Sequence, residues 1–549
     1  MKHGVKYFSG MTNSRLVLLG GRVFTSDPDQ PWVEAVVVDG DSIAYAGMAD
    51  EARRIAGTDA EVIDIAGGVV LPGFVDGHAH LLMTGAAILK AQLRTASTLE
   101  EIQQRLIDWV AENPDAPRVL GISWLFDALP GLPTKEMLDA VISDRPVYLD
   151  ANDLHSTWVN SAALAELGIT TDTADPIGGR IVRDPSTGQA TGHLLETATV
   201  ELVWPLLANV DDATRDAHLA AALRAYNEAG VTSAVDMAVN GDMLAAMQRA
   251  ETNGTLTVRI VGHWIIHRSS DPDEELAQVE MAARMKSLQQ SDLLRVVGIK
   301  IIVDGTIDGC TAALIRPYAD GANADPIWDS VSLKRVVSSA DAAGLQVALH
   351  AIGDQAVRIA IDALEFAAHT NGTSARRHRI EHLEYVDQAD VVRFAPLGIT
   401  ASMQLVHIDP ATLPNWVAML GDDRADRGFA WREFLDAGTT LAFGTDTPTA
   451  PHYPLHNMYI AATRRSPGNP TLAPHRPDFA LPLDEAVVHA TRDSAWASFR
   501  NDEVGMICKG LRADLIVLDR DPFDNQPESL LVARVTRTIL DGRTVHAVP

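Results

Sequence analysis

Eight short apolar runs recur along the middle of the chain, and each is followed by a stretch with helical spacing. Runs of this kind, rich in β-branched residues, are typical of strands buried on both faces of a parallel sheet. Intervening stretches such as 212–230 and 329–344 end in glycine, a common helix stop. Eight strand–helix units predict an α/β fold, a (β/α)8 TIM barrel whose reactive groups lie at the carboxyl ends of the strands. The runs lie at 70–80, 231–239, 257–266, 296–305, 345–354, 378–386, 399–408 and 440–448.

The two ends of the chain have a different pattern, in which short strands alternate with Gly and Asp turns. Neither end is long enough to bury a core by itself. We therefore expect one small β-sandwich domain built from both termini, residues 1–70 and 501–549. The barrel is expected over 71–500, and its segment 90–210, too long for a single crossover, predicts an inserted α/β subdomain.

Composition narrows the classes of function. Hydrophobic residues make up 46% and charged residues 21% of 549 residues, which is typical of a globular protein with a sizeable core. The 45 Lys+Arg against 73 Asp+Glu give a net charge of −28, and such a surface repels phosphate backbones and anionic membranes. We therefore expect a small-molecule substrate, with neither nucleic acid nor a membrane as partner.

Cysteine content and the N-terminal sequence indicate the compartment. Two cysteines, Cys310 and Cys508, in so long a chain argue against a disulfide scaffold and predict a reducing, cytoplasmic location. The start of the chain lacks the continuous apolar stretch of a signal peptide. No window approaches the roughly 18 apolar residues of a membrane span. Met1 and Met11 are both possible starts.

Polar residues suited to metal binding fall at the ends of five predicted strands. His78 and His80 are two apart, so both imidazoles project from the same face of one strand. Imidazole and carboxylate are ligands that suit zinc and similar divalent ions. The alternative is a structural polar network, but so many ligand types at the strand ends of one barrel favour a metal site. The candidates are His78, His80, Lys300, His350, His382 and Asp446.

Several longer motifs resemble a known family. LPGFVDGHAHL, the lone lysine, the two later histidines, the terminal Asp and the split β-domain resemble the metal-dependent amidohydrolase superfamily. DLHSTWVNSAAL, DPIGGRIVRD followed by TGHLLE, IKIIVDGTIDGCTAAL and LHAIGDQAV are similar to its family-3, YtcJ-like branch. The resemblance extends from Arg15 to about Val545. It also implies a homodimer, from the habit of the family.

The resemblance implies a role for each candidate ligand. His78 and His80 would hold the more buried metal, and His350 and His382 a second one. Lys300, the sole charge in an apolar run, would bridge the metals as a carbamate, which gives its costly burial a purpose. Alternatively, its amine pairs with an acid such as Asp304. Whether one or two zinc ions are bound stays open.

Such a site predicts amide hydrolysis. Zinc lowers the pKa of bound water towards about 7 and so supplies hydroxide at neutral pH. Asp446 would bind metal, take the proton of the water and pass it to the leaving nitrogen. Within the family, the resemblance implies hydrolysis of N-substituted formamides to formate and a primary amine. A broader N-acyl amide or N-acyl amino acid hydrolase is the alternative. A metal-free binding protein of the same fold is disfavoured, because every ligand position is filled.

Further residues are candidates for the pocket. His155 could stabilise the tetrahedral oxyanion or orient the substrate, or be a surface histidine. Tryptophans are candidate walls or plain core. Histidines 263, 267, 407, 452 and 456 also lie near strand ends, but the superfamily pattern gives them no metal role. The substrate-binding candidates are Trp124, Asp153, Trp158, Asp304 and Trp416.

Overall fold

The computed structural model describes residues 15–151, 156–176, 179–196, 198–372, 376–524 and 526–548. The chain divides into two compact units. Unit 1 consists of 1–81 and 223–549, and unit 2 of 82–222. Among the described residues, no helix has the length and apolar character needed to cross a membrane.

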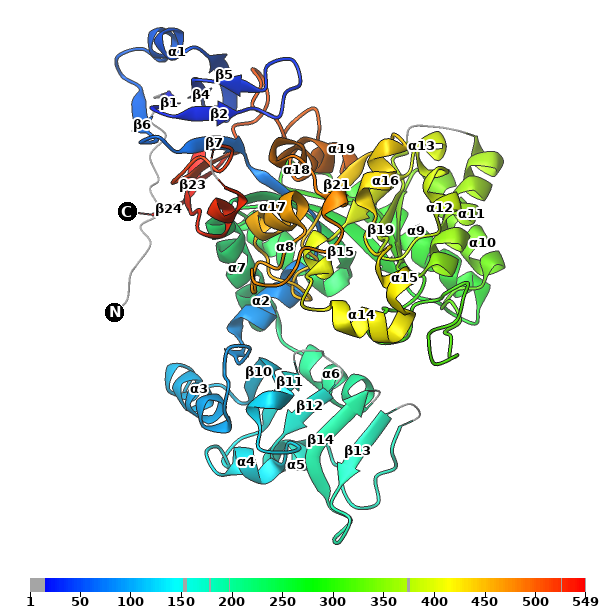
Figure 1. The fold of residues 1–549 in the computed structure, drawn as a ribbon. Helices are drawn as coiled ribbons and strands as arrows, with labels where there is room; N and C mark the ends of the chain where they lie inside the picture. Colours follow the sequence, from blue (N-terminus) through cyan, green and yellow to red (C-terminus); the bar gives the residue numbers. More distant parts are fainter. Residues whose placement is uncertain are drawn as a thin grey trace. The chain divides into compact units, whose positions relative to one another are not determined.

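Unit 1 contains an eight-stranded, all-parallel sheet that curls into a nearly closed barrel (Figure 1). Each strand pairs with the next one along the chain, in the order β21-β20-β19-β18-β17-β16-β15-β8. All eight coincide with the apolar runs of the sequence, so the predicted TIM barrel is confirmed. The strands are β8 (Phe74–Ala79), β15 (Val231–Val239), β16 (Arg259–Ile266), β17 (Leu294–Ile302), β18 (Gln346–Ala351), β19 (Arg379–His382), β20 (Thr400–Met403) and β21 (Leu441–Phe443).

Helices lie between successive barrel strands and after the last one, as their spacing predicts. Polar side chains cap several of them: Asn240 accepts from Met243 N at the start of one helix, and Asp329 accepts from Val331 N and Ser332 N at another. The helices are α7 (Asp212–Ala229), α8 (Gly241–Thr252), α9 (Pro272–Leu288), α10 (Ser330–Ala342), α11 (Asp354–Asn371), α12 (Gln388–Val391), α13 (Phe394–Leu397), α14 (Leu413–Leu420), α15 (Asp422–Ala425), α16 (Trp431–Asp436), α17 (Pro454–Thr463), α18 (Leu483–His489) and α19 (Arg492–Ala497).

Glycines let the first and last barrel strands approach closely. A Cβ on Gly444 would lie 2.3 Å from His78 N, and one on Gly77 would lie 2.7 Å from Phe443 O. Both distances are shorter than real Cβ atoms allow. Asp446 N donates to His78 O at 2.7 Å across this junction. The close approach brings the carboxyl ends of β8 and β21 together.

Two further sheets of unit 1 are built from the ends of the chain, the first from N-terminal strands alone and the second from strands of both ends. One has the order β5-β4-β1-β6 and the other β24-β23-β22-β7-β2-β3. In the second sheet, β7 from the first part of the chain pairs antiparallel with β22 from the last (Figure 1, blue and red). Apolar residues of both parts form one core cluster. The elements are β1 (Leu16–Leu19), β2 (Arg22–Phe24), β3 (Trp32–Val33), β4 (Ala35–Asp39), β5 (Ser42–Gly47), α1 (Ala49–Ala56), β6 (Glu61–Asp64), β7 (Val69–Pro72), β22 (Leu515–Leu518), β23 (Val535–Leu540) and β24 (Arg543–Ala547).

Unit 2 carries its own six-stranded mixed sheet, in the order β13-β14-β12-β11-β10-β9. Strands β9, β10 and β11 pair parallel, and the remaining pairs are antiparallel. Its core clusters consist of residues of this unit alone. The elements are α2 (Leu81–Leu89), β9 (Ala91–Gln92), α3 (Leu99–Glu112), β10 (Val119–Trp124), α4 (Lys135–Asp139), β11 (Val147–Ala151), β12 (Ser156–Val159), α5 (Ser161–Glu166), β13 (Gly179–Arg183), β14 (Ala190–Glu196) and α6 (Trp204–Ala208).

Candidate metal centre

Asp446 and the His78–His80 pair converge where β8 and β21 meet. Both imidazoles face Asp446 Oδ1, with His78 Nε2 at 3.3 Å and His80 Nε2 at 3.1 Å. Asp446 has a φ of 56°, a left-handed conformation that is strained for a non-glycine residue and common at functional sites. Burial favours the neutral acid, but the surrounding histidines outweigh it and hold the pKa of Asp446 well below its usual range. The three side chains therefore offer two imidazole nitrogens and a carboxylate at one point.

The buried ion pair between Glu381 and Arg379 orients His78. Its Nδ1 lies 2.7 Å from Glu381 Oε2, and neither side chain is exposed. Arg379 donates from Nε to Glu381 Oε1 at 2.6 Å, and from Nη2 to Ser402 Oγ. Burial would raise the pKa of Glu381, yet the charge of Arg379 and the bond to His78 hold it well below normal. An ionised Glu381 keeps the proton of His78 on Nδ1 and leaves Nε2 free to coordinate.

Asp76 connects the same strand to the segment that carries Asp446. Its Oδ1 accepts from Thr445 N at 2.8 Å, and its Oδ2 accepts from Thr445 Oγ1 at 2.6 Å and Tyr226 Oη at 2.9 Å. Burial raises the pKa of Asp76 to about 6. Asp76 therefore positions the turn before Asp446 rather than facing the centre.

His350 and His382 end the adjacent strands β18 and β19. Their ring centroids are 4.3 Å apart, and the ring of His382 lies 4.8 Å from that of His78. Burial lowers the pKa of His350 to about 3 and that of His382 well below normal. Both rings are therefore neutral at pH 7, the form that binds metals. His382 has a φ of 76°, a second strained position at the centre.

Lys300 points into the same region from β17. Its Nζ lies 3.4 Å from His78 Nε2, and the residue is 2% exposed. Burial lowers the pKa of the amine to about 8. The carboxylate of Asp304 instead accepts backbone N–H bonds from Ala313, Ile352 and Gly353 at 2.9–3.0 Å. Asp304 is thus an anchor for the ends of β17 and β18, and its full burial leaves little of it for a substrate.

A further histidine, His407, enters the centre from the short 3₁₀ turn Leu405–Ile408 after β20. Its Nε2 lies 3.5 Å from Asp446 Oδ2 and 3.3 Å from Thr449 Oγ1. Its Nδ1 lies 3.2 Å from Glu384 Oε1. Burial would lower the pKa of His407, but the hydrogen bond to Glu384 and the charge of Asp446 raise it overall.

The donor set fits a divalent metal ion. Among the described residues, two groups have ligand atoms within 4.8 Å of one another: His78, His80 and Asp446, and His382, His407 and Asp446. The Nδ1 atom of His382 is buried and has no hydrogen-bond partner in the described part of the chain. An unpartnered buried nitrogen is costly unless a ligand satisfies it. Imidazoles with a carboxylate are the donors that zinc prefers.

The other predicted site residues lie in different surroundings. Trp124 and Trp158 belong to the apolar core of unit 2 and donate their indole N–H to Leu149 O and Thr134 O. This favours packing over a role as pocket walls. Trp416 is 2% exposed and packs 5.3 Å from the ring of Phe429. Asp153 and His155 lie outside the described residues.

Sequence reasoning missed the acids that support the centre. Glu381, Glu384 and Asp76 are all buried, and each interrupts one of the apolar runs that form strands. An acid in such a run is expensive to bury without a partner, so this was the available signal. A polar residue in an apolar run does not always indicate the metal centre. His263 interrupts a similar run, but it is hydrogen-bonded to Gln346 in the barrel interior.

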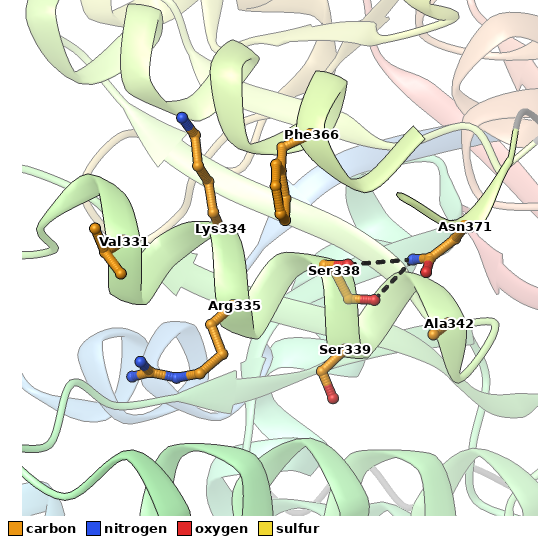
Figure 2. Close-up of a pocket in the computed structure, with 8 residues that line it drawn as sticks. All are labelled: Val331, Lys334, Arg335, Ser338, Ser339, Ala342, Phe366 and Asn371. Atoms are coloured by element: carbon orange, nitrogen blue, oxygen red, sulfur yellow. Dashed lines mark hydrogen bonds between the residues drawn. The ribbon is translucent and has the colours of Figure 1, made fainter. Parts of the chain in front are cut away.

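A cavity of about 650 Å³ lies away from these side chains, on the outer helices α10 and α11 (Figure 2). Phe366 and Val331 contribute apolar surface, and Asn371 donates to Ser338 on the facing helix. None of its lining residues is a histidine, cysteine or acid. The residues that line the cavity therefore offer no imidazole, thiolate or carboxylate as a metal ligand.

The chain is similar to known proteins over almost its whole length. It is 30% identical to the putative amidohydrolase YtcJ of Bacillus subtilis, covering 96% of this chain and 98% of that protein. It is 31% identical to the N-substituted formamide deformylase of Arthrobacter pascens, covering 97% and 98%. An uncharacterized metal-dependent hydrolase from Pyrococcus furiosus has a similar structure, with a TM-score of 0.76, 28% identity and coverage of 93% and 100%.

The model of the amidohydrolase family matches residues 61–546, which include both β-domain segments in part and the whole barrel. The resemblance seen in the motifs is thereby confirmed. The chain belongs to the amidohydrolase family, within the metal-dependent amidohydrolase superfamily.

Proposed function

We propose that the protein hydrolyses the C–N bond of linear amides, with zinc as its metal and N-substituted formamides as its substrates. The convergence of His78, His80 and Asp446 at the barrel mouth carries the proposal, because it offers a ligand set and a proton carrier together. The similarity to a formamide deformylase supports the choice of acyl group. A broader N-acyl amide hydrolase is the second candidate.

The metal would be held by the predicted ligands, His78, His80, His350, His382 and Asp446. A divalent ion, when bound, lowers the pKa of water and polarises a carbonyl oxygen. Asp446 then has a task of its own, to take a proton from the attacking water and deliver it to the amine nitrogen. Thr449 Oγ1 donates to Asp446 Oδ2 at 2.9 Å and so fixes the carboxylate for this transfer.

Lys300 is proposed to act as a carbamate. Carbamate formation joins the neutral amine to carbon dioxide and releases a proton, so it requires a lysine that loses its proton near neutral pH. The lowered pKa of about 8 and the neighbouring His78 meet this requirement. The charge of the group would change from positive to negative, which suits a site that holds cations.

Two residues of the segment between β11 and β12 are proposed to contact the substrate. His155 and Asp153 carry the proposed roles of oxyanion stabilisation and substrate contact. Homodimer formation and a cytoplasmic location are likewise proposed. The excess of 73 acidic over 45 basic residues repels a phosphate backbone, so nucleic acid is not a proposed partner.

Metal analysis combined with a substrate pair tests the function. The purified protein is assayed for bound metals, then with N-benzylformamide and N-benzylacetamide before and after chelation. We expect bound zinc, activity lost on chelation and restored by zinc, and a higher kcat/KM for the formamide. Equal values for both amides would favour the broader hydrolase, and full activity without metal would overturn the proposed chemistry.

A further inference from the structure

We infer that His407 is a metal ligand, which together with His382 and Asp446 forms a coordination position that the superfamily pattern does not assign to it. The inference rests on the proposal that the centre binds a divalent ion. His407 lies in the turn that follows β20, the barrel strand that precedes β21 in the chain. No ligand was predicted from the sequence at the end of β20.

The arrangement of the rings carries the first step. The rings of His382 and His407 are nearly parallel, with planes 7° apart and centroids 6.1 Å apart. His407 Nε2 lies 3.5 Å from Asp446 Oδ2. One ligand atom from each of the three residues lies within 4.8 Å of the others, a spacing that a single ion can span.

A carboxylate on the far side of the ring carries the second step. Glu384 Oε1 lies 3.2 Å from His407 Nδ1, as Glu381 Oε2 lies 2.7 Å from His78 Nδ1. Metal-bound histidines characteristically donate their other N–H to a carboxylate, which fixes the tautomer. The two acids are three residues apart in the segment 381–384, so one stretch of chain orients two imidazoles towards Asp446.

The surroundings of Asp446 and His382 carry the third step. His407 Nε2 lies 3.5 Å from Asp446 Oδ2, and Thr449 Oγ1 donates to that same oxygen at 2.9 Å. The Nδ1 atom of His382 is buried and has no hydrogen-bond partner in the described part of the chain. A cation held between these side chains would satisfy a nitrogen that the protein itself leaves unpaired.

Cobalt titration tests the assignment. The whole protein is stripped of metal and titrated with Co²⁺, and bound ions are counted by mass spectrometry while visible absorption reports the ligand field. The variants are His407→Ala and Glu384→Gln, with His456→Ala as a control because it removes a half-buried imidazole outside both ligand groups. Circular dichroism and thermal unfolding establish that each variant is folded.

We expect His407→Ala to lose one ion, or to bind it at least 10-fold more weakly, with a changed cobalt spectrum. Glu384→Gln should weaken the same ion by about 10-fold, and His456→Ala should match the wild type. Unchanged stoichiometry, affinity and spectrum in folded His407→Ala would overturn the inference while leaving the proposed function intact. A wild-type protein that binds no Co²⁺ or Zn²⁺ would instead overturn the proposed function.

Discussion

Two clusters of charged side chains are buried at opposite ends of the barrel strands, and they are satisfied in different ways. At the amino end, Arg259 begins β16 and donates from Nε to Asp514 Oδ2 at 2.7 Å. Its other nitrogens reach Asp541 and Asp292 O. Each guanidinium nitrogen of Arg259 therefore meets an acceptor. At the carboxyl end, by contrast, imidazole nitrogens of His78, His80 and His407 converge on one carboxylate, that of Asp446.

The difference separates a structural cluster from a binding site. A buried charge paired with its complement is stable as it stands, although removing one partner is costly. Imidazole nitrogens gathered around one carboxylate are instead a set of metal ligands, and one of the buried nitrogens there, His382 Nδ1, has no hydrogen-bond partner in the described part of the chain. Both clusters are buried, so the kinds of side chain that meet, and whether a buried nitrogen is left for a ligand, distinguish them.

The largest expected effect comes from breaking the structural cluster. Arg259→Met leaves Asp514 buried without its partner, so the free energy of unfolding should fall by about 3–5 kcal/mol. Denaturant unfolding measures the loss, and metal content per folded molecule should be unchanged. Arg54→Met, which removes an exposed i,i+3 pair with Glu51, is the control and should leave the free energy of unfolding nearly unchanged, because water screens that pair. Equal losses in both variants would contradict the assignment.

Asp446→Asn tests the cluster at the carboxyl end, where we expect a loss of activity rather than a loss of stability. The amide keeps the shape and an oxygen ligand but carries no proton, so kcat should fall by about 10²-fold or more. The unfolding midpoint should change little, because asparagine fills the same space and also tolerates the left-handed backbone conformation of this position. Steady-state kinetics and metal analysis of the same preparation check both statements. Normal turnover would move the proton transfer to another residue, with His155 the next candidate.

Glu381→Gln is expected to have a smaller effect on the same cluster. The amide still contacts His78 Nδ1 but is a weaker acceptor, so zinc affinity should fall by about 10- to 100-fold. A competition titration with a chromophoric chelator measures the affinity. Zinc binding as tight as in the wild type would show that Glu381 serves only to pair Arg379.

The smallest effect is expected from a substitution in the apolar core of unit 2. Trp158→Phe keeps most of the ring area but loses the hydrogen bond to Thr134 O, so the free energy of unfolding should fall by about 1 kcal/mol. Because Trp158 packs in the core of its unit, kcat/KM should stay within about twofold of the wild type. A 10-fold lower kcat/KM with little loss of stability would restore Trp158 as a pocket wall.

The sequence alone determined the barrel and the positions of its candidate ligands. Apolar runs with helices between them have a local periodicity, so all eight strands could be located without knowing their neighbours. The His78–His80 spacing is local as well, and residue type alone marks Asp446 and Lys300 as unusual near strand ends.

Only the tertiary structure decided which polar groups meet. Glu381 contacts a histidine 303 residues away, and His407 approaches Asp446 across neighbouring strand ends. Such contacts depend on strand register and on the close approach that Gly77 and Gly444 permit, neither of which has a local signal. His263 illustrates the point, since its run resembles that of His78 while its partner, Gln346, makes it part of the barrel interior. The sequence pattern predicts the strand and the position on it that a residue occupies. The packing of distant strands decides which atoms its side chain contacts.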